Sequence, residues 1–108
     1  MVTLRGQTDD YLQALKQALD HYETVHENTG AEATVYRQNP GSIRIRIIDR
    51  RFEGMSRGRR HDEVWDFLAD RVSDDTMSEV SVLLLLAPAE LGSSMMNMEF
   101  DDPVKSDL

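Results

Sequence analysis

The chain has 108 residues, a net charge of −8 and no cysteine. This length predicts one domain that buries its own core, and the lack of cysteine excludes disulfides, thiolate metal ligands and thiol catalysis within the chain. The start of the chain has no signal-peptide pattern, and the longest apolar run, residues 82–87, is far too short to cross a bilayer. We therefore expect a cytoplasmic protein that does not enter a membrane.

The first expected element is an amphipathic helix that starts at Thr8 or Asp9 and ends near Gly30. Residues 1–7 before it show no periodic pattern and are expected to be a flexible N-terminus. A short oxygen-bearing side chain caps a helix start, and glycine accepts the left-handed conformation that often ends a helix. Between them, apolar residues recur at spacings of three and four: Tyr11, Leu15, Ala18, Tyr22 and Val25.

Two strands are predicted next, over residues 31–37 and 43–48, and the turn at residues 39–42 joins them into an antiparallel hairpin. The second strand alternates isoleucine with other residues, which is typical of a half-buried strand. Its isoleucines are expected to pack under the first helix, and its arginines are expected to face outward: Ile43, Ile45 and Ile47 against Arg44 and Arg46.

A second helix is predicted to follow Ser56, which is a suitable N-cap. Its apolar residues share one arc of a helical wheel, and His61 falls near the middle of that arc, toward the core. Residues 80–87 predict a third strand, and the helical segment before it is long enough for a right-handed crossover to a parallel neighbour. The order α-β-β-α-β predicts an α+β fold with two layers: a three-stranded mixed sheet and helices on one face.

The last segment, residues 92–108, mixes methionines and Phe100 with acidic residues. One interpretation is a flexible acidic tail. The alternative is that the methionines and Phe100 fold over Leu83 and Leu85, or dock on another protein. Leu83 and Leu85 can also pair two copies of the chain into a homodimer.

Arginine is concentrated in residues 37–60, where eight arginines stand against two acidic residues. One interpretation is a solvated face that balances nearby acids. The other is a surface for nucleic acid or another anionic partner, because the planar guanidinium can form two parallel hydrogen bonds with a phosphate or a carboxylate. The residues expected to form this surface are Arg44, Arg46, Arg50, Arg51, Arg57, Arg59 and Arg60.

No motif in the sequence indicates a catalytic site. The glycines at 54 and 58 lack the Gly-Lys-Ser/Thr ending of a phosphate-binding loop, and no serine–histidine–acid set has a defensible spacing. His61 and the acids after it point about 100° apart on a helix and cannot converge on one metal ion. His61 is therefore interpreted either as a core histidine bonded to the backbone or as a ligand or recognition residue.

The segment of residues 52–65 has the pattern F-E-G-x-S-x-x-x-R-H-x-x-V-aromatic, which resembles the signature of the BolA-like (stress-induced morphogen) family. The strand before it and the A-P-A-E-L ending at residues 87–91 are also similar, so the resemblance covers residues 8–91. The matching positions are Phe52, Glu53, Gly54, Ser56, Arg60, His61, Val64 and Trp65.

This resemblance implies a BolA-like fold related to class II KH domains and a non-enzymatic role. That role is transcription regulation in a stress response through nucleic acid or, as the alternative, a protein-binding adaptor for a monothiol glutaredoxin in iron–sulfur cluster handling. The family's cluster-binding histidine would correspond to His61. Asp62 replaces a positive residue, the position near Glu79 lacks a second family histidine, and residues 38–42 supply neither cysteine nor histidine. We therefore expect no cofactor beyond a cluster shared with the partner, with His61 as its one ligand from this chain.

Overall fold

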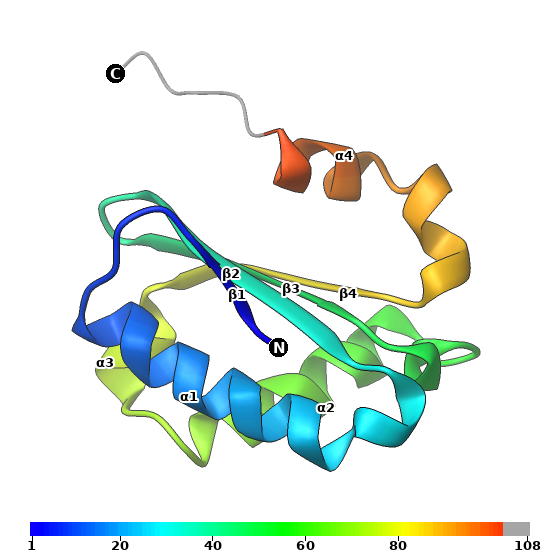
Figure 1. Ribbon diagram of the computed structural model, residues 1–108, viewed down its shortest axis with the longest axis horizontal. Helices are drawn as coiled ribbons and strands as arrows, with labels where there is room; N and C mark the ends of the chain where they lie inside the picture. The colour runs from blue at the N-terminus through cyan, green and yellow to red at the C-terminus, as the bar shows by residue number, and fades with distance from the viewer. Residues whose placement is uncertain (103–108) are drawn as a thin grey trace.

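The computed structural model describes residues 1–102 and shows an α+β fold with a four-stranded mixed sheet, in the order β1-β2-β3-β4 (Figure 1). The strands are β1 (Thr3–Arg5), β2 (Glu32–Asn39), β3 (Ser42–Ile48) and β4 (Val80–Leu86). The helices are α1 (Asp10–Val25), α2 (Arg57–Ala69), α3 (Asp74–Ser78) and α4 (Met95–Asp101). Short 3-10 turns lie at Glu27–Thr29, Arg50–Phe52 and Pro88–Ser93.

The predicted pairing of the central strands is confirmed, because β2 and β3 are antiparallel and β4 runs parallel to β3. The prediction of three strands is wrong, since β1 adds a fourth strand parallel to β2, with Leu4 beside Val35. A three-residue strand is too short to show a period of two, and long-range pairing creates it. Residues 1–7, expected to be flexible, thus include a strand at the sheet edge.

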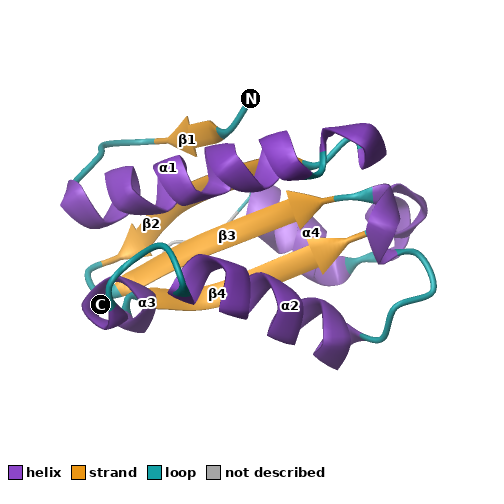
Figure 2. Cartoon of the chain, turned by 90° about the horizontal axis from the view of Figure 1, so that it is seen from below, coloured by secondary structure: helices purple, strands orange, loops and turns teal. Residues whose placement is uncertain are grey.

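α1, α2 and α3 cover one face of the sheet, and Figure 2 shows this face toward the viewer. The predicted start of the first helix is confirmed, because the Asp9 carboxylate accepts from the Leu12 amide at 3.0 Å. The helix ends earlier than predicted, at Val25, and the left-handed Gly30, with a φ of 72°, ends the 3-10 turn that follows it. As predicted, Ile43, Ile45 and Ile47 of β3 face these helices, and they have no exposed surface. The main core therefore lies between β2, β3, β4 and the first two long helices.

α4 covers the opposite face, so the prediction of helices on one face only is wrong (Figures 1 and 2). Phe100 is 1% exposed and packs in a second cluster with Tyr36, Leu84 and Leu86. Leu83 and Leu85 instead pack toward the helix side, where Leu85 is buried and Leu83 is partly exposed. Residues 92–102 of the expected tail are folded, and residues 103–108 lie outside the described residues.

Within residues 1–102, no helix combines the length and the apolar character that crossing a membrane requires. The longest helix, α1, has 16 residues and carries charged side chains along its outer surface.

Two glycines around the start of α2 provide a paired test of this local structure. Gly54 has a φ of +77°, whereas Gly58 lies in the first turn of α2, and a Cβ at either position would meet no atom within 4 Å. Gly54→Ala is therefore expected to lower the free energy of unfolding by about 1 kcal/mol through backbone strain alone. Gly58→Ala is expected to raise it by about 0.5 kcal/mol, because alanine loses less entropy in a helix. Urea denaturation of both variants measures the difference, and equal effects would contradict the left-handed turn.

Candidate functional site

The connection between β3 and α2 is built around buried polar groups. Asp49 has no exposed surface, and its carboxylate accepts from the Arg51 amide at 2.9 Å and from the Tyr22 hydroxyl at 3.3 Å. Phe52 is fully buried, and Ser56 caps α2 as predicted by accepting from the Arg59 amide at 3.2 Å. These contacts fix where α2 starts relative to the sheet edge.

Arg60 is buried at the start of α2 and does not lie on an exposed rim. Its guanidinium donates to the backbone oxygens of Met55 at 3.1 Å and Leu85 at 3.0 Å. It also binds both carboxylate oxygens of Glu90, at 2.7 and 3.2 Å. Arg60 therefore ties the connection, α2, β4 and the turn after β4 together, which is a structural role.

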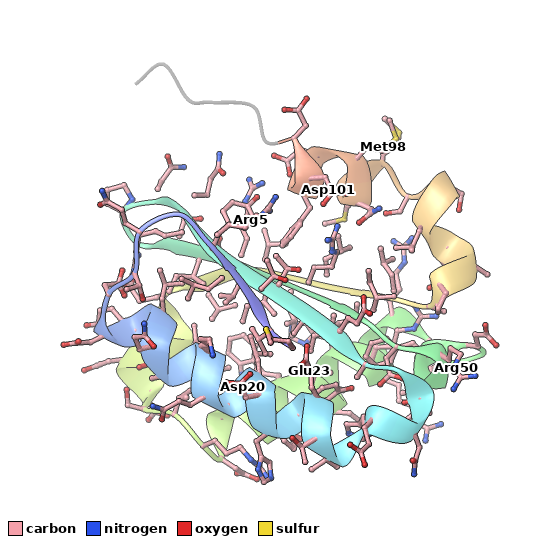
Figure 3. The ribbon with its side chains drawn as sticks, in the orientation of Figure 1. Arg5, Asp20, Glu23, Arg50, Met98 and Asp101 are labelled. Carbon is pink, nitrogen blue, oxygen red and sulfur yellow. The ribbon has the colours of Figure 1, made fainter. Side chains whose placement is uncertain are left out.

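Most arginines of the connection form hydrogen bonds or ion pairs with other groups of the same chain. Arg51 donates to Glu63 at 2.7 Å and to the Tyr22 hydroxyl at 3.2 Å, and burial raises the pKa of Tyr22 to about 12. Arg59 shares the same Glu63 carboxylate at 3.3 Å, although its side chain is 68% exposed. The pKa of Glu63 is lowered, chiefly by its hydrogen bond from Arg51. Arg50 donates to backbone oxygens of the turn after α1 and points outward at the end of the sheet (Figure 3).

Arg44 and Arg46 lie on the sheet face opposite the isoleucines, as predicted, but α4 covers them. Arg44 binds both oxygens of Glu99, at 2.6 and 2.7 Å, and Arg46 binds Asp101 at 2.6 Å. The hydrogen bond that Arg44 donates to Glu99 is the main cause of the raised pKa of Arg44. The seven predicted surface arginines are therefore not brought together as one open surface. Those on the exposed surface are Arg50, Arg57 and Arg59.

His61 is exposed, so the prediction that it faces the core is wrong. The buried line of α2 runs through Arg60, Val64 and Leu68, and His61 is turned about 100° away from it. The helical-wheel prediction was wrong because it placed His61, the less polar of the two residues, at the inward position of the first turn. In the structure, the neighbouring Arg60 is buried at that position. The His61 ring stacks on Trp65, with centroids 5.5 Å apart and planes at 13°.

A groove of about 570 Å³ lies beside His61, between the start of α2, the strand β4 and the start of α4. Its lining combines cationic, anionic, aromatic-stacked and apolar groups: Arg57, His61, Leu83, Glu90, Met95 and Met96. Met95 is 83% exposed and Met96 is 55% exposed. A hollow of about 590 Å³ between α1 and the end of α2 contains none of the predicted site residues. The groove, which the sequence did not indicate, is thus the place where His61 meets other chemistry-bearing residues.

The groove does not provide a complete metal or cluster site of its own. Over residues 1–102, no three histidine, aspartate or glutamate side chains gather as metal ligands. A two-iron cluster takes thiolate or imidazole ligands, two on each iron. His61 offers one such ligand, and its nearest carboxylate is that of Asp62 at 3.9 Å. Among residues 1–102, the groove therefore offers one ligand of the kind that such a cluster takes, His61.

The Arg60–Glu90 pair predicts a dependence of stability on pH. The pKa of Glu90 is lowered from 4.5, chiefly by the hydrogen bond from Arg60. The stabilisation is therefore full above about pH 4.5 and is lost as the pH falls through the lower folded-state pKa. Glu90→Gln is expected to lower the free energy of unfolding by about 1 kcal/mol at pH 7, because the 41% exposed carboxylate is partly screened by water.

Urea denaturation between pH 3 and pH 7 would measure this difference. Glu53→Gln serves as the control, since Glu53 is exposed and forms no ion pair with any described residue. A difference between wild type and Glu90→Gln that stays constant down to pH 3 would contradict the assignment.

The site as a whole offers binding chemistry: a cation, an exposed imidazole, an apolar strand and flexible methionines around one groove. No protein-family model matches the chain, and comparisons with curated proteins and with solved structures give no significant match. A functional assignment therefore rests on the motif at residues 52–65 and on the geometry of the groove.

Proposed function

We propose that this chain is a non-enzymatic, BolA-like binding module that acts as an adaptor for another protein, which docks on the groove beside His61. The observation that carries the proposal is the exposed His61 ring, stacked on the half-buried Trp65, at a groove bordered by exposed methionines. Methionine side chains adapt to different partner surfaces, and aromatic groups are enriched at the centres of protein interfaces.

The charge arrangement favours a protein partner over nucleic acid. Five of the seven expected surface arginines pair with carboxylates of the same chain: Arg44, Arg46, Arg51, Arg59 and Arg60. The chain is also acidic overall, with a net charge of −8. Phosphate binding depends on uncompensated cations and released counterions, so this pairing weakens the nucleic-acid interpretation.

The resemblance at residues 52–65 makes a monothiol glutaredoxin the first partner to test. In such a complex, His61 would face the partner across the groove. A cluster held in common would need most of its ligands from the partner, because His61 is the one such ligand that the described part of the chain brings to the groove. The proposal is therefore one of protein docking, with no step that requires the cluster.

The test is a titration of the isotope-labelled full chain with a monothiol glutaredoxin, followed by amide NMR shifts. The expected shifts cluster in residues 57–65 and 83–96. His61→Ala is expected to weaken binding at least about fivefold, as for a central interface residue. His21→Ala is the matched control, because His21 is also exposed and stacked on an aromatic ring but lies between α1 and α2.

Two results would count against the adaptor proposal. One is an unchanged spectrum at saturating partner, or shifts that map away from the groove. The other is tight binding of a DNA or RNA oligonucleotide at the same amides with a steep loss of affinity in salt, which would restore the nucleic-acid interpretation.

A further inference from the structure

The sheet face under α4 carries a second set of side chains, apart from the groove. The strand register places Arg5 beside Tyr36, Tyr36 beside Arg44, and Arg44 beside Val82. In a parallel row, Arg46 lies beside Leu84. We call the first group, Arg5, Tyr36, Arg44 and Arg46, the basic–aromatic strip, and the β4 group, Val82, Leu84 and Leu86, the apolar strip.

α4 packs on both strips through three consecutive residues, Glu99, Phe100 and Asp101. The Phe100 ring meets Tyr36 edge-on at 5.0 Å, and its carbonyl accepts from Arg5 at 2.9 Å. The residues on either side of it, Glu99 and Asp101, bind the two arginines of β3. Figure 3 shows Arg5 on the α4 side of the sheet and Met98 on the outer side of α4.

This fit leaves hydrogen-bonding capacity unused. The Nε atoms of Arg5, Arg44 and Arg46 are buried without a partner among the described residues. Arg44 and Arg46 each contact the acids of α4 through Nη1 alone, whereas a guanidinium normally forks onto a carboxylate through two nitrogens. Buried unsatisfied donors cost free energy, so a ligand with better-placed carboxylates would bind more favourably than α4.

We propose that this face is a docking surface for an acidic amphipathic helix of a partner protein, and that α4 is its displaceable intramolecular substitute. The partner helix would carry an aromatic residue between two carboxylates, as Glu99-Phe100-Asp101 does, and would place apolar residues on the apolar strip. α4 has only seven residues and is joined to β4 through a turn that ends in Gly92 and Ser93, so it can leave without disturbing the main core.

This surface is distinct from the groove at His61, and its existence does not depend on the adaptor proposal. The two are linked structurally, because Met95 and Met96 in the first turn of α4 also line the groove. Displacing α4 would therefore alter the groove as well. Loss of arginines of the basic–aromatic strip should abolish helix docking, whereas His61→Ala should not, which separates the two proposals.

The test uses the full chain with Glu99→Lys and Asp101→Lys, which places lysines opposite Arg44 and Arg46 and should release α4. The probe is a fluorescent peptide with the sequence of residues 94–102, followed by anisotropy. The released variant is expected to bind it at least about tenfold more tightly than wild type. Asp66→Lys with Asp102→Lys is the control with the same charge change, since neither residue forms an ion pair with a described residue. This control should bind like wild type.

Adding Arg44→Ala and Arg46→Ala to the released variant should return binding to the wild-type level. Equal binding by the released and control variants, or binding that survives loss of both arginines, would overturn the proposal. Tighter binding of an oligonucleotide than of the peptide would overturn the helix as occupant. Wild-type dimers at the concentrations used would instead make a second copy of the chain the occupant, and would overturn the assignment to another protein.

A second measurement needs no variant and therefore does not depend on how the lysine variant folds. Excess peptide added to wild type should accelerate amide hydrogen exchange in residues 94–102, because α4 is displaced, and should leave exchange in α1 unchanged. Unchanged exchange in residues 94–102 at a peptide concentration that saturates the chain would overturn the displacement.

Discussion

Replacing Arg60 by alanine is expected to lower the free energy of unfolding by about 3 kcal/mol, the largest effect of any charged residue around the groove. The buried guanidinium holds two backbone oxygens, of Met55 and Leu85, and the Glu90 carboxylate. Its loss leaves the buried Leu85 oxygen without this donor and removes the guanidinium that lies over the Phe52 ring, 5.7 Å from its centroid. Urea denaturation followed by circular dichroism measures the change.

Arg57→Ala is the matched control for this prediction, since Arg57 is exposed in the same turn of α2. Its effect is expected to stay within about 0.5 kcal/mol. Arg60→Lys should fall between the two, because lysine keeps the charge but cannot reach several acceptors with a planar fork. A loss below about 1 kcal/mol for Arg60→Ala would contradict the structural role and would return Arg60 to the candidate binding surface.

Phe100→Ala is expected to have a comparable effect, a loss of about 3 kcal/mol in the stability of the α4 contact. Phe100 is 1% exposed and packs against Tyr36, Leu84 and Leu86. The guanidinium groups of Arg5 and Arg46 also lie 5.0 and 4.8 Å from its ring. Because the contact joins α4 to one sheet face, the main core is expected to remain folded and α4 to detach.

Hydrogen exchange distinguishes this local loss from global unfolding. Exchange in residues 94–102 should rise to that of an unfolded segment, while α1 and β3 stay protected. Met98→Ala is the control on the same helix, since Met98 is 65% exposed, and it should change little. Equal exchange in residues 94–102 of wild type and Phe100→Ala would show that Phe100 does not hold α4 on the sheet.

The groove and the face under α4 illustrate why the site was only partly predictable. The motif residues Ser56 and Gly54 indicated a strand-to-helix connection, and the structure places them there. His61 was correctly singled out, but its direction depended on which residue of the first turn is buried, and that residue is Arg60. The pairing of Arg44 with Glu99 joins positions 55 residues apart, which no local pattern of the sequence contains.

The sequence by itself determined the α1, β2, β3, α2 and β4 elements, because periodicity and capping are local properties of neighbouring residues. It also allowed a parallel crossover to β4, through the length of the segment before it, and the strand pairing shows that crossover. Only the tertiary structure decided the fourth strand, the position of α4 and the exposure of His61. These features depend on contacts between distant segments, where an arginine becomes buried or free according to the carboxylate that folding brings beside it.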